Sequence, residues 1–380
     1  MTKLVLRTRP LLVYLDSSDI SNLSNPESLK DNDVLLARQK LLAWIKSGDI
    51  VVRYSLAHIM EALPISKEAA ELGKLRIELI KLLCGDKVFL DPITIFLNEL
   101  NGTPLESVLN DSGCWFPAMD ELWSEETDKP GDPPKNRSER RRAKSLAKKN
   151  YFIASNPEAV KFVQEFPIKK SAVLDMIFGS GSQNPIGKAI QSSTKDLDFL
   201  FKWYMSNWDG STAFTLATRK AGEEFSGILA EGSKQVKEEY EKLVQEKNEL
   251  AYINEQLGTL ARKIAEQAPR EIVAALTEGS LPPTVEANFE TLPSVTSFSN
   301  VGAQIFLASV ASTKNARKPR RSDFGDLIHV IYLPYVDVFS ADGATSDYIR
   351  KANVKTNAAI VTGLPALITK IQSVLSSSNS

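Results

Sequence analysis

The sequence predicts an α/β protein built on a parallel sheet, and a long, mainly helical insertion splits this domain in sequence. Short apolar strand patterns alternate with helical patterns over the first hundred residues, and the same alternation returns near the C-terminus. Between these two parts, about two hundred residues carry helical patterns and a proline-rich basic stretch. Because strands that alternate with helices are typical of parallel sheets, we expect the two outer parts to form one domain.

The first part begins with the apolar run LLVYLD, which predicts a strand at 11–16. A helix is expected at 33–48, where leucines recur at helical spacing and Gly48 ends the pattern. The further elements expected here are a strand at 50–55, a helix at 55–63 capped by Ser55, a helix at 67–83 ended by Gly85, and a strand at 87–90.

The middle of the chain has a different composition. Residues 128–150 combine proline, glycine and clustered basic residues, which is typical of an exposed connection. Helical patterns cover 151–277, and apolar residues from Val236 to Ile264 form a heptad-like stripe. The stripe predicts a long helix or hairpin that packs on a neighbour, with a dimeric coiled coil as the alternative. Three aromatic residues at helical spacing are expected in the core of the insertion rather than in base stacking: Trp203, Tyr204 and Trp208.

The last part restores the alternation of strands and helices. Helices are expected at 322–335, 347–353 and 365–375, and strands at 336–342 and 358–363. We therefore divide the chain into an α/β domain, first part, at 9–100, an insertion at 101–302 with its basic connection at 128–150, and the second part of the domain at 303–380.

The composition excludes several classes of protein. The 46 basic and 47 acidic residues nearly cancel, so a histone-like or polybasic membrane binder is not expected. Two cysteines and two histidines disfavour a disulfide framework, a structural zinc site and a Ser-His-Asp hydrolase. The first residues place arginines and a proline where a signal peptide needs an apolar core, and no apolar run approaches about 18 residues. We expect a soluble, cytoplasmic protein with no membrane partner.

Four acidic residues stand where open α/β sheets place their sites, after strands or on the helices beside them: Asp16, Glu61, Asp326 and Asp342. Asp323, three residues before Asp326, is the alternative third acid. Carboxylates that converge repel one another, and a hard divalent cation such as Mg²⁺ or Mn²⁺ relieves that repulsion through oxygen ligands. The pattern predicts a metal site in which these four carboxylates are also the catalytic residues.

Three segments carry a resemblance to a known family. They are VYLDSSDISNL with Asp16, SLAHIME with Glu61, and DLIHVIYLPYVDVFSAD with Asp326 and Asp342. In this order and context they resemble the PIN-domain ribonucleases, over residues 9–100 and 303–365. Ser340 matches the Ser or Thr that often stands two residues before the last acid of the family, whereas an insertion of this length departs from its pattern.

The resemblance implies an activity and a cofactor. In that family the matching acids bind one or two Mg²⁺ or Mn²⁺ ions, and a metal-activated water cleaves single-stranded RNA. Carried over by position, the metal ligands are Asp16, Glu61, Asp326 and Asp342. The chain is therefore expected to be a metal-dependent endoribonuclease, with DNA as the alternative substrate.

Two basic runs are candidates for nucleic-acid contact. The run at 135–149 is equally well explained as a solvated surface, whereas the run at 314–321 lies immediately before Ser322 and Asp323, beside the predicted site in sequence. The residues expected to contact phosphates are Arg317, Lys318, Arg320 and Arg321. Near the acids, His58 and His329 are expected to orient other groups or to lie at the edge of the core. Asp19 and Ser17 are candidates for helix capping or for support of the metal's water shell, and we favour capping for Asp19.

Other functions remain open at this stage. The main alternative is a PIN-like scaffold that binds nucleic acid or a protein without cleaving. A toxin or defence nuclease restrained by a protein partner and a small-molecule phosphohydrolase are further alternatives, and the insertion is a candidate surface for such a partner.

Overall fold

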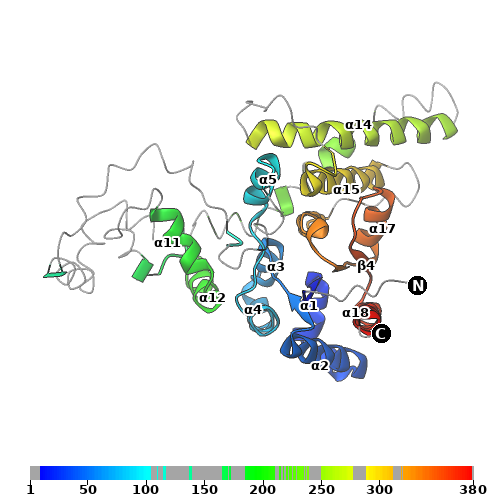
Figure 1. Cartoon of the computed structure of the whole chain (residues 1–380). Coiled ribbons are helices and arrows are strands. Elements are labelled where there is room, and N and C mark those ends of the chain that lie inside the picture. The colour runs from blue at the N-terminus through cyan, green and yellow to red at the C-terminus, as the bar shows by residue number, and fades with distance from the viewer. Residues whose placement is uncertain are drawn as a thin grey trace.

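The computed structural model describes residues 9–103, 185–209, 250–276, 288–310 and 321–378, together with individual residues between these ranges. These residues form an α/β fold around one parallel sheet (Figure 1). The α/β class and the parallel sheet predicted from the sequence are therefore confirmed. The division into domains stays a prediction, and residue 303, at its second boundary, lies inside a helix.

The sheet has four strands in the order β2-β1-β3-β4. The strands are β1 (Leu11–Tyr14), β2 (Ile50–Val52), β3 (Val338–Ser340) and β4 (Ala359–Val361). Val13 of β1 lies opposite Val52 on one side and Val338 on the other, so β1 is central. Strands from the two ends of the sequence thus pair directly in one sheet.

Helices from the first part of the chain are α1 (Ser17–Ser24), α2 (Asn32–Ser47), α3 (Leu56–Ala62), α4 (Ala70–Cys84) and α5 (Pro92–Leu100). Residues suited to helix termini mark the end of α2 and the start of α5. Gly48 takes a left-handed conformation (φ 80°) after α2, which a residue without Cβ adopts at little cost. Asp91 begins α5 because its carboxylate accepts a hydrogen bond from the amide of Thr94 at 3.0 Å.

Helices from the rest of the chain complete the fold. They are α11 (Pro185–Thr194), α12 (Leu197–Ser206), α14 (Leu250–Leu276), α15 (Pro293–Val310), α16 (Ser322–Val330), α17 (Gly343–Lys351) and α18 (Leu364–Ser378). The long helix α14 lies along α15 (Figure 1). The prediction of a long helix that packs on a neighbour is confirmed over 250–276, whereas the contacts of the heptad-like stripe itself stay a prediction.

The sheet separates two apolar cores, as the alternation of side chains along a strand requires. Leu11 and Val13 pack with α2, α4 and α18, whereas Leu12 and Tyr14 pack with α5, α15, α16 and α17. Figure 1 shows α15 and α17 on one side of the strands and α2 and α18 on the other. Two buried faces explain why the strands read as continuous apolar runs.

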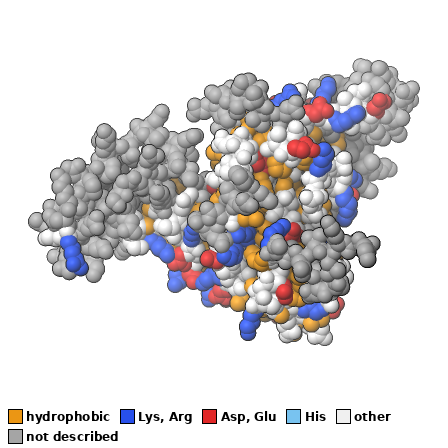
Figure 2. Space-filling model, in the orientation of Figure 1, with side chains coloured by type: hydrophobic (Ala, Val, Ile, Leu, Met, Phe, Trp, Pro, Cys, Tyr) orange, Lys and Arg blue, Asp and Glu red, His pale blue; other side chains and the backbone are white. Residues whose placement is uncertain are grey.

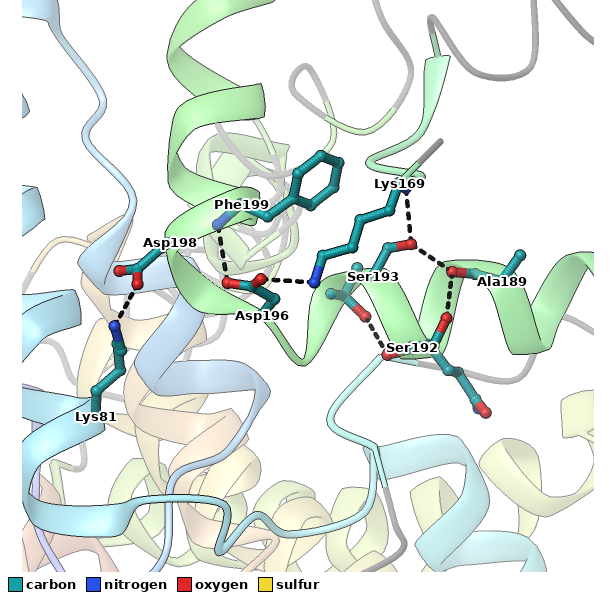
Figure 3. A network of polar contacts seen from close by, with 10 residues as sticks. Lys81, Lys169, Ala189, Ser192, Ser193, Asp196, Asp198 and Phe199 are labelled. Atoms are coloured by element: carbon teal, nitrogen blue, oxygen red, sulfur yellow. Dashed lines mark hydrogen bonds and ion pairs between the residues drawn. The ribbon is translucent and has the colours of Figure 1, made fainter. Parts of the chain in front are cut away.

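Part of the predicted insertion packs on the first part of the chain. The Tyr204 hydroxyl of α12 donates to the carbonyl of Pro64 at 3.1 Å, and Lys81 of α4 pairs with Asp198 of α12 (Figure 3). Asp196 begins α12 by accepting from the amide of Phe199 at 3.1 Å. Tyr204 is fully buried, and Trp203 and Trp208 pack against the same core, so the predicted core role of these aromatics is confirmed.

Three predictions on elements need correction. The strand expected at 87–90 is only an isolated parallel bridge between Tyr54 and Val88, because the flanking amides of Lys87 and Asp91 donate to the carbonyls of Cys84 and Cys114 instead. The helix expected at 322–335 ends at Val330, and a short 3₁₀ turn that contains Pro334 follows it. The helix expected at 347–353 begins earlier, at Gly343, because Asp342 caps it.

Asp337, which directly precedes β3, joins the two central strands of the sheet. Its carboxylate accepts a hydrogen bond from the amide of Leu12 at 2.7 Å and pairs with Arg9 at 2.8 Å. The contact ties the start of β1 to the segment before β3. Asp337 therefore fixes the register of the two central strands.

Charged side chains of both signs are interspersed over the face seen in Figure 2. Among the described residues, no helix combines the length and apolar composition needed to cross a bilayer.

Candidate acidic site at the carboxyl ends of β1 and β3

The site lies beside β1, where the order of the parallel strands switches from one side of β1 to the other. From β1 the chain moves to β2 on one side, and it later returns to place β3 on the other side of β1. In open α/β sheets, ligands bind beyond the carboxyl ends of the strands at such a switch point. Asp16 follows β1 and Asp342 follows β3, so the fold brings two of the predicted acids to this point.

Asp16 occupies the turn between β1 and α1. Its backbone is extended (φ −74°, ψ 157°), and its carbonyl accepts the first helical hydrogen bond, from Ile20 at 3.1 Å. The carboxylate makes no capping hydrogen bond to the helix and instead accepts from the Ser18 hydroxyl at 2.8 Å. The Asp16 side chain is 7% exposed, so a carboxylate is held almost out of water at the end of the central strand.

Glu61 comes from α3, whose start is fixed by a capping box between Ser55 and His58. Its backbone carbonyl accepts from Arg76 at 3.2 Å, and its side chain is 32% exposed. The carboxylate rests on Gly325 of α16, where an added Cβ would lie 1.7 Å from Oε1. Glycine at this position therefore lets α16 approach the Glu61 carboxylate directly.

Asp326 directly follows Gly325, the residue that the Glu61 carboxylate contacts. The pKa of its carboxyl is raised to about 8, first by burial and then by the negative charges of Asp342, Glu61 and Asp16. Each of the other three predicted acids is therefore close enough to act on the carboxyl of Asp326. Asp323 has another role, because its carboxylate accepts from the amide of Arg320 at 2.8 Å and closes the first turn of α16.

Asp342 begins α17. Its carboxylate accepts from the amide of Thr345 at 2.6 Å, which uses one oxygen as a helix cap. The other oxygen makes no hydrogen bond among those found for the described residues. Asp342 is thus both a cap and a member of the acidic group, so the capping and metal-binding interpretations of this residue do not exclude each other.

The acidic group is not arranged as a ready metal cage. Among the described residues, no three His, Cys, Asp or Glu side chains are placed to hold a metal ion. The donor set nevertheless suits a hard cation, since it consists of carboxylates whose mutual repulsion raises the pKa of Asp326. Coordination by all four would require the side chains to move closer together.

Both histidines of the chain are buried beside the turn that carries Asp16, where His58 contacts Leu15 and His329 contacts Ser17. Their rings meet edge to face with centroids 5.0 Å apart, and each is 3% exposed. Nε2 of His58 donates to the carbonyl of Leu15 at 2.8 Å, and Nδ1 accepts from the amide of Ser55 at 3.0 Å. Burial and the charge of His329 lower the pKa of His58 to about 3, so this ring is neutral. His58 thereby fixes the backbone just before Asp16.

His329 joins Glu61 to the end of β1. Its Nε2 lies 2.9 Å from the Ser17 hydroxyl and 3.7 Å from Oε2 of Glu61, and its Nδ1 lies 2.6 Å from the Tyr14 hydroxyl. Burial alone would lower the pKa of His329, but Glu61 raises it above its ordinary value. Burial would likewise raise the pKa of Glu61, which His329 and Ser17 lower.

Asp19, for which the sequence analysis favoured helix capping over support of a metal's water shell, is a further buried acid beside Asp16. Asp19, on the first turn of α1, is 3% exposed, and its Oδ2 has no hydrogen-bond partner among the described residues. Burial raises the pKa of Asp19 to about 6, while the Ser340 hydroxyl and the backbone of Asp16 lower it in part. The run DSSD was the available signal, since a second acid three residues after the first lies on the same side of a helix.

The basic run before α16 is only partly described. Lys318 and Arg320 are exposed, and Arg321 forms an ion pair with Glu223, with Nη1 at 3.6 Å from Oε1. Arg317 lies outside the described residues, as does most of the run at 135–149.

Comparison with protein-family models, with curated proteins and with solved structures finds no match to the chain. The fold class of the chain therefore rests on its structure alone, and the acidic site is the basis for the function proposed below.

Proposed function

We propose that the chain is a metal-dependent endonuclease with a PIN-like domain split by an insertion, and that it hydrolyses phosphodiester bonds in single-stranded RNA. The observation that carries this proposal is the gathering of Asp16, Glu61, Asp326 and Asp342 at the switch point between β1 and β3. They come from segments that are far apart in sequence. A buried acid whose pKa is raised by burial and by neighbouring carboxylates, as that of Asp326 is, is typical of functional sites.

The four carboxylates would hold Mg²⁺ or Mn²⁺. Such an ion supplies positive charge at the phosphate and lowers the pKa of a bound water. In the chain itself, Asp16 and Asp342 present carboxylates from the ends of neighbouring strands. Glu61 and Asp326 present theirs from α3 and α16, which pack on each other. The exposed basic residues Lys318 and Arg320 precede α16 and supply charge for phosphate contacts.

A non-catalytic PIN-like scaffold is the second candidate. The observation that favours it is that no three described acidic or histidine side chains are already placed around one metal position. A scaffold would bind nucleic acid or a protein through the same surface without cutting.

Cleavage of labelled single-stranded RNA, duplex RNA and single-stranded DNA separates the two candidates. The parent protein is expected to cut single-stranded RNA with Mn²⁺ or Mg²⁺ and to lose activity in EDTA. Asp16→Asn is expected to lose cutting while its melting temperature stays near that of the parent. Absence of cutting by a folded, metal-loaded parent would favour the scaffold.

A further inference from the structure

We propose that His329, held by Tyr14, is the positioning residue that fixes the Glu61 carboxylate at the acidic site. This inference rests on the proposed function and names the group that organises its metal ligands. His329 lies on α16 one turn after Asp326, so it links the third acid to the second.

The imidazole of His329 is held at both nitrogens. Nδ1 lies 2.6 Å from the Tyr14 hydroxyl, which in turn lies 2.7 Å from the Ser55 hydroxyl. Nε2 lies 2.9 Å from the Ser17 hydroxyl. Because the ring is buried, rotation away from these partners would leave polar atoms without hydrogen bonds, which is costly.

Tyr14 is itself buried and packed between aromatic rings. Its ring stacks on Phe339 at 5.1 Å and on Tyr332 at 5.6 Å between centroids, and it is fully buried on the central strand. The orientation of His329 is therefore set by a buried, closely packed residue of the central strand. A group held in this way can fix a neighbour that is itself partly exposed.

Glu61 has few other restraints. Its carboxylate faces Gly325, which has no side chain, and Arg76 holds only its backbone carbonyl. Among the described residues, His329 Nε2 lies 3.7 Å from Oε2 of Glu61, and the Ser17 hydroxyl and the more distant His58 also act on this carboxylate. Since Ser17 and Tyr14 occupy the two ring nitrogens, His329 supports a ligand and is not one itself. Groups in this supporting role typically change metal affinity 10- to 100-fold when they are replaced.

Two substitutions separate positioning from packing. The amide nitrogen of Gln reaches the position of Nε2, whereas that of Asn reaches the position of Nδ1. His329→Asn is therefore expected to weaken Mn²⁺ binding about 10- to 100-fold and to lower kcat more than it raises KM. His329→Gln is expected to keep more of the affinity, although both variants lose the ring. Tyr14→Phe, which keeps the stacking, is expected to weaken Mn²⁺ binding in the same direction as His329→Asn.

Equal Mn²⁺ affinity in the parent, His329→Asn and Tyr14→Phe would overturn the inference. So would equal losses in the Asn and Gln variants together with equal drops in melting temperature, because that result indicates packing alone.

The ring nitrogens give a test that needs no metal. The chain has only two histidines, so their ¹⁵N signals are readily assigned. Glu61→Gln is expected to shift the His329 signals more than those of His58, and unchanged His329 signals would overturn the inference. A parent that binds no Mn²⁺ while His329 responds to Glu61→Gln would overturn the proposed function and leave the contact between His329 and Glu61 standing.

Discussion

His58 shows how one buried side chain supports the site without belonging to it. It caps α3, which carries Glu61, and holds the carbonyl of Leu15 beside Asp16. The sequence places His58 three residues before Glu61 and so on the same face of a helix. It does not reveal that the ring is turned inward, because the contact with Leu15 joins segments more than forty residues apart.

The neutral state of His58 predicts a pH effect on stability. Its pKa is about 3 in the folded chain and near 6.5 when unfolded, so the unfolded state binds more protons between these values. The free energy of unfolding therefore decreases as the pH falls, by about 1.4 kcal/mol per pH unit from this residue. Between pH 7 and 5, the parent is expected to lose about 2 kcal/mol more than His58→Gln in urea unfolding. Parallel losses in both proteins would contradict the assignment.

Gly325 is required by the close approach of Glu61. In Gly325→Ala, the new Cβ would displace the carboxylate, and because Oε1 ends a flexible side chain the fold is expected to survive. Mn²⁺ affinity is expected to fall about 10-fold while stability changes by no more than about 1 kcal/mol.

Gly258→Ala on α14 is the matched control, since no atom lies within 4 Å of its added Cβ. It is expected to leave Mn²⁺ binding unchanged. The same affinity in both variants would show that Glu61 does not need this space.

At the scale of elements, α15 depends on a buried acid. Glu99 of α5 accepts from the amide of Ser294 at 2.8 Å, and the Tyr335 hydroxyl also donates to it. Burial raises the pKa of Glu99 above its ordinary value. The segments around it precede β3, so this contact lies at the amino ends of the strands, away from the acidic site.

Removal of this acid is expected to affect stability alone. Glu99→Ala leaves buried donors without an acceptor and should cost about 2 kcal/mol or more in urea unfolding. Mn²⁺ binding should stay at the parent value. Glu78→Ala, on the exposed side of α4, is the control and should cost under about 0.5 kcal/mol. Similar losses in the two variants would contradict the role of Glu99.

The sequence predicted most helices and all four strands of the sheet because their signals are local. Gly48 ends α2 and Ser55 begins α3 as expected. The error at 87–90 has a non-local cause: the amide of Asp91, which a longer strand would use for pairing, donates to the carbonyl of Cys114. In the same way, the four acids were predicted from their positions after strands or on neighbouring helices, whereas Tyr14 and Gly325 were missed because their roles depend on partners distant in sequence.

At the scale of the whole molecule, the near-zero net charge requires that nucleic acid be bound by a local basic patch. Replacement of Arg317, Lys318, Arg320 and Arg321 by Gln is expected to weaken RNA binding and to reduce the slope of log affinity against log salt by up to about 3. The matched control replaces Lys30, Lys40, Lys46 and Lys370, which lie on or beside α2 and α18, elements that carry none of the four acids. Equal slopes in the two variants would assign the run to an ordinary solvated surface.

The central claim is that the carboxyl ends of β1 and β3 form a divalent-metal site. Titration with Mn²⁺, followed by electron paramagnetic resonance, tests it directly in the parent, in Asp16→Asn and in the control Asp347→Asn. Asp347 lies on α17 and pairs with Lys351 at 2.7 Å, so it adds a comparable charge outside the acidic group. We expect the parent and Asp347→Asn to bind Mn²⁺ equally and Asp16→Asn to bind at least about 10-fold more weakly. Equal binding by all three proteins, or no binding by the parent, would contradict the claim.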